Sequence, residues 1–449
     1  MKKLFYIFAL GLTLSMASCA PSEVDDIFDE NPAVRIDNAV KNYTELLKSN
    51  GGRWNMKYFA NGDEGGYNFM MLFKNGSVEI SGKNYYTGDA FVQDESMWEV
   101  IADYGPVLTF NTYNEVFHLF SDPTPDGTGL GGDYEFIVMK AEENKITLRG
   151  KKTGITAVLE RVTDNVTDQE FFAEVEANRA ASFSTLVDTL YITTSTGYQF
   201  AAVGHNDEVW TIFPAAGDRA ANIIDYPEIM NSMSTRNGIR FMEPLSFFTE
   251  YDPEAFIPQD FTIQEDGSLL AEDGVTRITA GPLSNVFAAK LNTFVVDKTD
   301  MGGDFKTYYE NFTTGARAAL RRTINDLCFT YFNIFDSRRF NRFAMQFKAA
   351  SLSCAIFLDY TIVDDNTVSI SFNPNAATPY NNNGKTYYNG VEQLRDFIAM
   401  LTSRQLSFKT DNVLRPTVLT MYDKANPENY FVLKMTQNAN YVDESTIEY

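Results

Sequence analysis

A run of short alternating strands joined by hairpin turns is the feature that most constrains the fold of this chain of 449 residues. Trp54, Met56 and Tyr58 alternate with polar residues, which is the period of a strand with one buried face. Asn75-Gly76 is a hairpin-turn signal between two further strands. Strands are also expected at residues 67–73, 78–81, 96–102, 107–111, 134–140, 145–150 and 156–162. This meander favours an up-and-down barrel or a sandwich.

Helical spacing of apolar residues interrupts the strands at four places. Helices are expected at residues 33–49, 167–186, about 308–335 and 391–402. More strands are expected between residues 191 and 271, and again between residues 342 and 435. The sequence therefore predicts a mainly β protein with a few helices. Its first part is expected to be a calycin-like antiparallel barrel or sandwich, followed by a second, larger β-rich domain with helices.

The expected organisation has four parts: a signal peptide at residues 1–18, an acidic tether at 19–32, a first β-domain with its helix at 33–165, and the second domain at 166–449. The second domain also contains a weak internal echo of the first. Residues 406–410 resemble residues 108–112, and residues 427–435 resemble residues 132–140. Two related β-modules are one explanation, and chance similarity between aromatic strands is the other.

The N-terminus has the pattern of an export signal. Lys2 and Lys3 precede an apolar run, Leu4–Leu14, which is long enough for a signal peptide and too short to span a bilayer. Small residues directly before Cys19 are typical of a bacterial lipobox, in which the cysteine becomes the acylated first residue. We therefore expect lipidation at Cys19 and attachment of the mature chain to the outer membrane through its acyl chains. An ordinary signal peptide with a chance cysteine is the alternative.

The charge of the chain limits its partners. The formal net charge is −23, and removing Lys2 and Lys3 with the signal makes the mature chain about −25. A phosphate backbone would be repelled, so we expect no nucleic acid partner. Acidic residues are concentrated directly after Cys19. This segment resembles the acidic tether of Bacteroidota lipoproteins, a resemblance that implies export to the outer face of the outer membrane, and a solvated linker is the alternative.

The sequence offers few residues for chemistry. Its histidines are His118 and His205, and neither has a metal-ligand partner at useful spacing or a motif with a nucleophile. Aspartates at positions 122, 126 and 133 match no established calcium loop, so a polar loop is favoured there. We expect no cofactor and no metal. Catalysis by a carboxylate pair stays open, because such a pair is defined by geometry rather than by spacing.

Cys328 and Cys354 are the cysteines that remain after Cys19. Two cysteines in an oxidising compartment can form a disulfide, and we keep that pairing as one alternative. Both lie among apolar residues, where a buried free thiol is common, and this is the other alternative.

Aromatic residues give the remaining hint of a binding site. Trp54, Tyr58 and Trp98 are the candidate ligand-binding residues, since aromatic rings line pockets and stack on sugars. The same could hold for Tyr85, Tyr86 and Trp210. The competing interpretation places aromatics at strand alternation in the core.

Several motifs resemble one family. They are Gly52-Arg53-Trp54-Asn55-Met56-Lys57-Tyr58-Phe59, Gly66-Tyr67-Asn68-Phe69, residues 105–114 and residues 131–136. On these motifs the chain resembles the Bacteroidota lipoproteins catalogued as domain of unknown function 4302, over most of the mature chain and more firmly up to about Val162. The resemblance implies a surface lipoprotein encoded beside outer-membrane nutrient-uptake systems. It supplies no catalytic residues.

We therefore expect a surface-exposed, lipid-anchored protein, and we favour a binding or accessory component over an enzyme. Its partners are expected to be the outer membrane, a nutrient-uptake complex, and a small ligand, glycan or peptide. Two alternatives stay open: a hydrolase with a carboxylate pair, and a structural or adhesin-like module that binds other proteins. A pocket with convergent polar groups favours ligand binding, and a flat apolar patch favours the interaction module.

Overall fold

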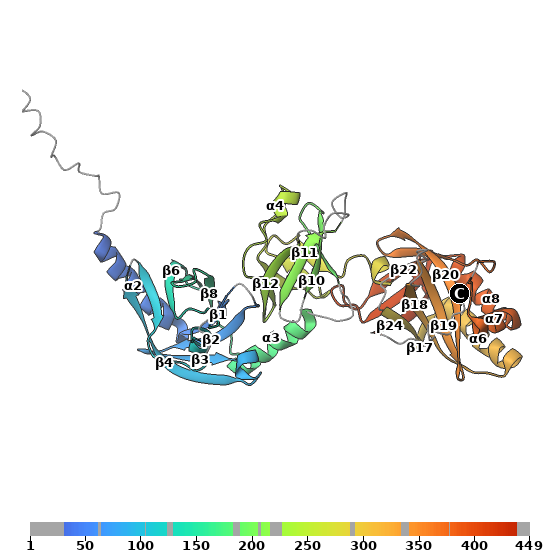
Figure 1. Cartoon of the computed structure of the whole chain (residues 1–449), viewed down its shortest axis with the longest axis horizontal. Coiled ribbons are helices and arrows are strands. Elements are labelled where there is room, and N and C mark those ends of the chain that lie inside the picture. Colours follow the sequence, from blue (N-terminus) through green and yellow to red (C-terminus); the bar gives the residue numbers. More distant parts are fainter. Residues whose placement is uncertain are drawn as a thin grey trace, which may run out of the picture. The chain divides into compact units, whose positions relative to one another are not determined.

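A computed structural model describes residues 31–61, 64–103, 105–123, 129–182, 189–204, 208–215, 227–287, 292–333, 341–376 and 378–437. The strands in these residues form three closed barrels of eight antiparallel strands each (Figure 1). In every barrel, strands that follow one another along the chain are neighbours in the sheet. The prediction of a mainly β protein that begins with an antiparallel barrel is confirmed. The region expected to be one larger β-rich domain contains two of the three barrels.

The first barrel is preceded by one long helix, α2 (Pro32–Lys48). Its strands are β1 (Arg53–Tyr58), β2 (Tyr67–Phe73), β3 (Ser77–Gly82), β4 (Val92–Ala102), β5 (Pro106–Phe110), β6 (Glu135–Ala141), β7 (Lys145–Gly150) and β8 (Thr156–Arg161). Two short 3-10 turns, η2 (Tyr85–Thr87) and η3 (His118–Phe120), lie in its loops. Helix α3 (Asp168–Ser182) follows the last strand.

The second barrel is built from the shortest strands. They are β9 (Leu190–Thr193), β10 (Gln199–Gly204), β11 (Val209–Pro214), β12 (Glu228–Thr235), β13 (Gly238–Phe241), β14 (Asp260–Ile263), β15 (Leu269–Ala271) and β16 (Arg277–Thr279). The one-turn helix α4 (Phe248–Tyr251) lies between β13 and β14. Strand β9 pairs with both β10 and β16, which closes the barrel.

The third barrel carries most of the helices. Its strands are β17 (Asn292–Gly302), β18 (Ile324–Asn333), β19 (Asn341–Ala349), β20 (Leu352–Asp364), β21 (Thr367–Ser371), β22 (Gln405–Thr410), β23 (Val418–Asp423) and β24 (Asn426–Gln437). Its helices are α5 (Leu283–Phe287), α6 (Gly303–Leu320), α7 (Asn382–Gly390) and α8 (Glu392–Thr402). Of the helices in the described ranges, none is both long and apolar enough to cross a membrane.

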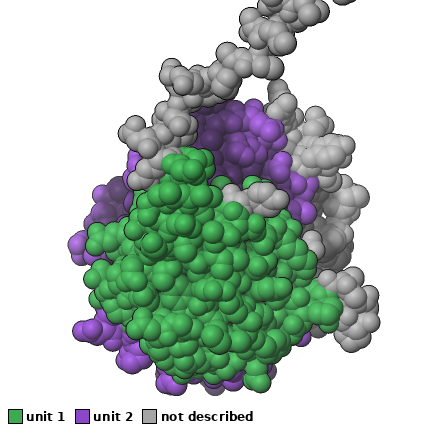
Figure 2. All heavy atoms as spheres, turned by 90° about the vertical axis from the view of Figure 1, so that its left-hand side faces the viewer, with its two compact units in different colours: residues 1–56, 70–81, 93–163 green, residues 57–69, 82–92, 164–449 purple. Residues whose placement is uncertain are grey.

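By its packing the chain divides into two compact units (Figure 2). The first comprises residues 1–56, 70–81 and 93–163, and the second comprises residues 57–69, 82–92 and 164–449. Two segments that belong to the first barrel by sequence, 57–69 and 82–92, are therefore part of the second unit. These two segments matter for the candidate site.

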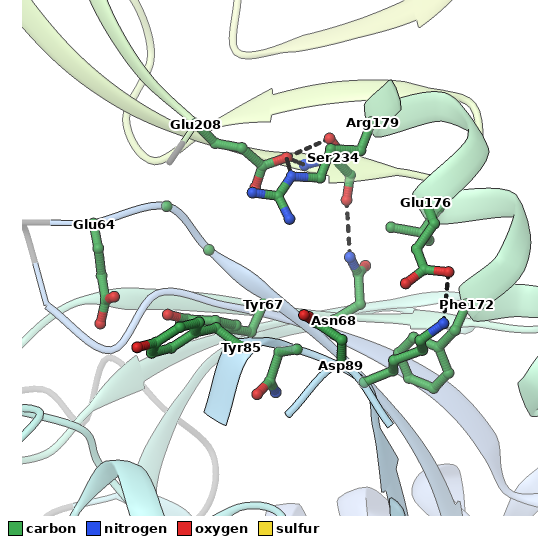
Figure 3. Close-up of a pocket in the computed structure, with 15 residues that line it drawn as sticks. Glu64, Tyr67, Asn68, Tyr85, Asp89, Phe172, Glu176, Arg179, Glu208 and Ser234 are labelled. Carbon is green, nitrogen blue, oxygen red and sulfur yellow. Dashed lines mark hydrogen bonds and ion pairs between the residues drawn. The ribbon is translucent and has the colours of Figure 1, made fainter. Parts of the chain in front are cut away.

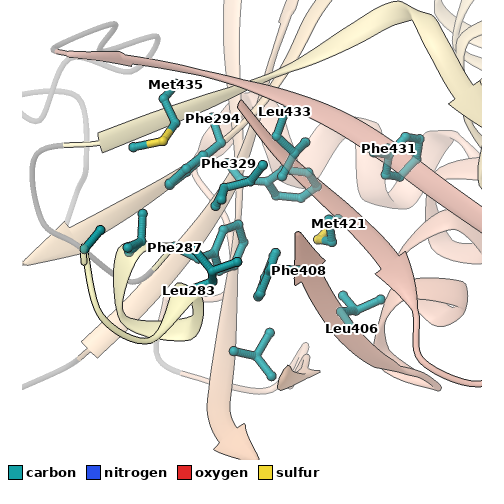
Figure 4. Close-up of a cluster of buried hydrophobic side chains, with 14 of the residues drawn as sticks. Leu283, Phe287, Phe294, Phe329, Leu406, Phe408, Met421, Phe431, Leu433 and Met435 are labelled. Carbon is teal, nitrogen blue, oxygen red and sulfur yellow. The ribbon is translucent and has the colours of Figure 1, made fainter. Parts of the chain in front are cut away.

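Alternation along the strands builds the core of the third barrel (Figure 4). Phe287 of α5 packs against Phe294 of β17 and Phe408 of β22, with ring centroids 5.2 and 4.6 Å apart. Phe329, Met421 and Leu433 are buried in the same cluster. Aromatic and branched side chains at every second position thus fill the interior, which is the role that strand periodicity assigns to them.

The C-terminal end of α2 is fastened to the first barrel by two buried side chains. The indole Nε1 of Trp54 donates to the carbonyl oxygen of Leu47 at 2.8 Å. Arg161, at the end of β8, donates to the carbonyl oxygens of Leu46 at 3.1 Å and Ser49 at 2.6 Å. The carbonyl oxygens of Leu46 and Ser49 also accept from the backbone N–H groups of Ser49 and Gly52, so Arg161 adds further donors at this end of the helix, where a cation interacts favourably with the helix dipole.

The expected helix at residues 308–335 is wrong in its second half. Helix α6 ends at Leu320, and Arg321 takes a left-handed conformation with φ of 53°. The chain then continues as strand β18, with Leu327 and Phe329 in the core. Apolar residues spaced three and four apart mimicked a helix there, whereas the aromatic and β-branched composition after Ile324 suits a strand.

Candidate functional site

The three tryptophan and tyrosine candidates lie in the protein interior. Trp54 is fully buried, and Tyr58 and Trp98 are 2% and 5% exposed. The indole of Trp98 donates to the carbonyl oxygens of Lys74 and Ser77 at 3.1 and 2.9 Å. The indole N–H groups of Trp54 and Trp98 are therefore used within the fold, and none of the three residues lines the pocket described below. The core interpretation of these aromatics accounts for their positions.

The two later cysteines are both free and buried, so the disulfide alternative is not what the structure shows. Cys328 pairs in register with Gln346 of β19, whereas Cys354 pairs with the next residue, Phe347. Successive side chains on a strand point to opposite faces, so the two thiols lie on opposite sides of the sheet. Burial raises the pKa of each thiol to about 12. The lipidation site predicted at Cys19 lies outside the described residues.

Of the remaining polar candidates, His118 and Asp133 are used within the fold, whereas His205 and Asp126 lie outside the described residues. His118 is buried; its Nδ1 accepts from the backbone N–H of Asn114 at 3.0 Å, and its Nε2 therefore donates to the carbonyl oxygen of Phe110 at 3.2 Å. Asp133 accepts from the backbone N–H groups of Lys152 and Thr153 at 2.7 and 3.0 Å. Within the described ranges, no group of three ligating side chains is arranged to hold a metal ion.

A pocket of about 410 Å³ is the strongest candidate for a functional site (Figure 3). All of its lining residues belong to the second compact unit. They come from two segments of the first barrel, from α3, and from the second barrel. They are Glu64, Gly65, Gly66, Tyr67, Asn68, Lys83, Asn84, Tyr85, Asp89, Phe172, Val175, Glu176, Arg179, Glu208 and Ser234.

Backbone hydrogen bonding holds the segment at residues 64–68 against β12. The N–H of Gly66 donates to the carbonyl oxygen of Ser232 at 2.9 Å. The Asn68 side chain donates from Nδ2 to the carbonyl oxygen of Ser234 at 2.8 Å. Gly66 has to be glycine, because a Cβ there would lie 2.7 Å from the Phe59 ring. This close approach fixes one wall of the pocket.

Glu208 also lines the pocket and has an unusual backbone conformation. It is buried and has φ of 64°, a conformation that residues with a side chain rarely adopt. Its carboxylate accepts from the backbone N–H of Ser234 at 2.9 Å and also from the Ser234 hydroxyl. Arg179 of α3 lies with Nε 3.7 Å from the same carboxylate. The charge of Glu208 is therefore compensated within the protein.

Helix α3 is positioned by the hairpin that joins β12 and β13. Asn178 donates to the carbonyl oxygens of Thr235 and Gly238 at 2.8 and 2.6 Å. Arg236 forms ion pairs with Glu174 at 2.5 Å and with Asp164 at 2.8 Å. Held on this side, α3 presents Phe172, Val175 and Glu176 to the pocket.

On the pocket side of α3, one ion pair and one ring contact reach the segment at residues 82–92. Lys83 Nζ lies 2.7 Å from Glu176 Oε2. Phe91 and Phe172 pack with ring centroids 6.0 Å apart. Figure 3 shows Glu176 on one side of the pocket and Arg179 with Glu208 on another. Both basic side chains of the lining are thus already paired with a lining carboxylate.

A tyrosine cluster forms the remaining side. The Tyr86 hydroxyl lies 3.2 Å from each carboxylate oxygen of Glu64. The rings of Tyr67 and Tyr85 flank Tyr86, with centroids 6.0 and 5.4 Å from it. Burial, and next the charge of Glu64, raise the pKa of both Tyr67 and Tyr86. Tyr85 is 80% exposed, so its ring is available at the edge of the pocket.

The turn that carries Tyr85 is capped by Asn84. Its Oδ1 accepts from the N–H groups of Tyr86 and Thr87 at 2.9 and 3.1 Å, and the Thr87 hydroxyl accepts from the Asn84 N–H. This reciprocal cap fixes the turn. The Asn84 Nδ2 is buried and has no hydrogen-bond partner in the structure. An orphan donor in a pocket lining is a group that a ligand can satisfy.

The aromatic residues predicted from the sequence differ in their relation to this pocket. Of the aromatics considered, Tyr85 lines the pocket, whereas the three preferred residues do not. The signal that could have favoured Tyr85 is local: Lys83-Asn84-Tyr85-Tyr86-Thr87-Gly88 is a polar turn outside the alternating strands. Aromatic rings in a turn are not required by a core.

The comparisons with known proteins add a family and little else. Among curated proteins, no match to this chain was found. The solved structures that resemble it include the β subunit from DNA polymerase of Streptococcus pyogenes, with 11% identity, 90% of this chain and 98% of that chain covered, and a TM-score of 0.13. Another is the botulinum neurotoxin serotype D binding domain, with 8% identity, 90% and 82% covered, and a TM-score of 0.09. Such TM-scores carry no argument about fold or function.

The family model described as "Domain of unknown function (DUF4302)" matches residues 24–256. This segment is more than half of the chain and includes every residue that lines the pocket. The match ends inside the second barrel, so the third barrel lies beyond it. On this match, the chain belongs to the DUF4302 family.

Proposed function

We propose that this protein is a lipid-anchored, surface-exposed, non-catalytic binding component of an outer-membrane nutrient-uptake system, and that its ligand occupies the pocket beside Tyr85. The observation that carries the proposal is the pocket itself, about 410 Å³ in volume. This size lies within the range of small-molecule sites. An exposed aromatic ring, two carboxylates without a cationic partner and an orphan amide donor surround it.

The binding role is supported by the contrast between this pocket and its surroundings. Most polar side chains near the pocket, such as Asn68 and Glu208, are bonded within the protein. Tyr85 and Asn84 differ from these, because one keeps an exposed ring and the other keeps a donor atom without a hydrogen-bond partner in the structure. A structural site has no need of such groups, whereas a ligand site does.

The test of the binding role is a thermal-shift screen of the mature chain against peptides, glycans, amines, haem, lipids and calcium. A ligand that binds the native state raises the melting temperature in a dose-dependent way. Tyr85→Ala should abolish the shift. Tyr113→Ala is the matched control, because Tyr113 is also an exposed tyrosine, at 57%, and is not part of the pocket lining. Equal loss with both variants, or with neither, contradicts binding in this pocket.

Anchoring rests on the sequence around Cys19, where small residues precede the cysteine. Cys19→Ala should move the protein from the membrane fraction to the soluble fraction. Ser18→Ala keeps a small residue before the cysteine and should leave the protein in the membrane. Retention of the Cys19→Ala protein in membranes would be the result that removes the lipid anchor from the proposal.

A further inference from the structure

The pocket lining has an imbalance of charge. Lys83 and Arg179 are its basic residues, and each is already paired with a lining carboxylate, Glu176 and Glu208. Two more carboxylates, those of Glu64 and Asp89, also line the pocket. Among the residues that the structure describes, neither forms an ion pair.

Glu64 and Asp89 are held in different ways, and both leave their charge uncompensated. Glu64 accepts from the neutral hydroxyl of Tyr86. Asp89 is exposed and follows the η2 turn, where its backbone N–H donates to the carbonyl oxygen of Asn84 at 2.9 Å. A hydrogen bond from a neutral group stabilises a carboxylate but does not cancel its field. The raised pKa of Tyr67 and Tyr86 is consistent with that field, since the charge of Glu64 contributes to it after burial.

An aromatic ring stands beside these charges. In Figure 3, Glu64, Tyr67 and Tyr85 lie together on one side of the pocket, and Asp89 lies along the lower edge. The ring of Tyr85 meets Tyr86 edge to face, at 79°, and remains 80% exposed. The face of an aromatic ring attracts organic cations. The carboxylates and the exposed tyrosine ring therefore both favour an organic cation as the ligand.

Other ligand classes fit less well. An anion would meet Glu64 and Asp89 without a spare basic residue in the described lining, on a chain whose net charge is −23. A bound metal ion would need at least a third ligand, and no such group of three occurs in the described part of the chain. An organic monocation needs only a carboxylate and a ring face.

We propose that the pocket binds a ligand that bears an ammonium or guanidinium group, with Glu64 and Asp89 facing the charge and Tyr85 stacking on it. This inference rests on the proposed function, because it specifies the ligand of the same pocket. The donor Nδ2 of Asn84 adds a place for a hydrogen-bond acceptor on the ligand. A lysine-bearing peptide carries both groups, whereas a free polyamine carries the cation alone.

The experiment is calorimetric titration of the full mature chain, kept soluble by Cys19→Ala. The probes are the amides acetyl-Ala-Lys-Ala and acetyl-Ala-Gln-Ala, with spermidine, cellobiose and citrate. The lysine peptide should bind at least about tenfold more tightly than the glutamine peptide, because only its side chain carries a charge. Raising sodium chloride from about 50 to about 500 mM should weaken its binding. Preference for spermidine over the lysine peptide would identify a free amine as the source of the cation.

The variants separate the pocket from the general negative charge of the surface. Asp89→Asn and Glu64→Gln should each weaken lysine-peptide binding by about tenfold. Asparagine tolerates the left-handed backbone of Asp89, whose φ is 59°, and glutamine still accepts from Tyr86, so both variants should fold. The control is Asp396→Asn, which removes an equal charge from an exposed position of α8. It should leave the binding constant unchanged.

Each result supports or overturns one of the two proposals. Binding of cellobiose or citrate that Tyr85→Ala abolishes, without binding of the lysine peptide, overturns the cationic class and leaves the binding function standing. Peptide binding that Asp396→Asn weakens as much as Asp89→Asn also overturns the cationic pocket, because the attraction is then general. No binding by any probe, together with no effect of Tyr85→Ala in the thermal screen, overturns both.

Discussion

Two of the regions that bring an aromatic ring and charged groups together differ in one respect, because only one of them contains a cation that lies over the ring. At the end of α2, the Arg161 guanidinium lies over the Trp54 ring, 4.0 Å from its centroid. Beside η2, the ring of Tyr85 and the carboxylates of Glu64 and Asp89 lack a cation. The first region is buried and fully bonded, while the second is exposed. The same residue types stabilise the fold where they are satisfied, and we propose that they serve recognition where they are not.

Removing the cation from the region at the end of α2 should have the largest effect. Arg161→Ala removes the hydrogen bonds that the guanidinium donates to the carbonyl oxygens of Leu46, Ser49 and Glu143, together with its contact on the Trp54 ring. We expect the first barrel to lose about 3 to 5 kcal/mol of unfolding free energy. Urea titration followed by tryptophan fluorescence would measure this loss in a Trp210→Phe background, so that the two tryptophans of the first barrel report. Arg161→Lys should lose less, and a loss below about 1 kcal/mol for Arg161→Ala would contradict the structural role.

Removing the indole N–H donor of Trp54 should have an intermediate effect on stability. Trp54→Phe keeps an aromatic face under Arg161 but loses the hydrogen bond from Nε1 to Leu47. The expected loss is about 1 to 3 kcal/mol, because a buried carbonyl becomes unsatisfied. The same titration measures it through Trp98, again without Trp210. Peptide binding in the pocket should be unchanged. A change in affinity would show that the two regions do not act independently.

Changing the charge balance of the region beside η2 should alter binding more than stability. Lys83→Met breaks the ion pair with Glu176 and leaves a third uncompensated carboxylate. Affinity for the lysine peptide should rise by about threefold, while the unfolding free energy changes by less than about 1 kcal/mol, because the pair is partly exposed. Titration calorimetry and urea unfolding give the two numbers. A fall in affinity would show that Lys83 itself contacts the ligand.

The smallest expected effect is a pH dependence of stability that arises from His118, which lies among aromatic rings. His118 is buried between Tyr113 and Tyr134, with ring centroids 5.5 Å away on each side, and its pKa is lowered, mainly by burial. The neutral ring is therefore favoured in the folded state, so stability is present above the unfolded pKa of about 6.5 and falls as pH drops below it. Urea midpoints between pH 7.5 and 5 should fall further for the wild type than for His118→Gln. Equal slopes would show that the ring does not titrate against folding.

Much of the fold could be predicted from local patterns, because each barrel is a meander of neighbouring hairpins. The Asn75-Gly76 turn lies between β2 and β3, and the predicted helices at residues 33–49 and 391–402 match α2 and α8. The prediction of a helix was wrong at β18 because the local spacing of apolar residues fits a helix as well as a strand. Helix α7 was missed because its sequence, Asn382–Gly390, is rich in residues typical of turns.

The internal echo does not correspond to equivalent strands. Residues 108–112 and 132–140 belong to β5 and β6, which are adjacent in the first barrel. Their counterparts belong to β22 and β24, which β23 separates in the third barrel. The similarity therefore follows from aromatic alternation, which any barrel strand can show, and does not align the two barrels strand by strand.

The pocket could not be predicted from local patterns, because it depends on distant pairings. Asn68 and Ser234 are in hydrogen-bond contact although 166 residues separate them in the sequence. The buried position of Glu208 and its left-handed backbone leave no trace in composition. Single-sequence periodicity identifies which residues are buried on a strand, but it does not identify which loops meet at the end of a barrel.

Closure of the three barrels also limits how other chains can be recognised. In a closed barrel each strand has a neighbour on both sides, so a closed barrel offers fewer unpaired strand edges than an open sheet. Addition of a peptide as an extra strand, a common mode of peptide binding, is therefore less favoured on these barrels than on an open sheet. Recognition on this scaffold therefore falls to side chains and turns. A partner can be changed there by replacing a few loop residues, without disturbing the pairing of any strand.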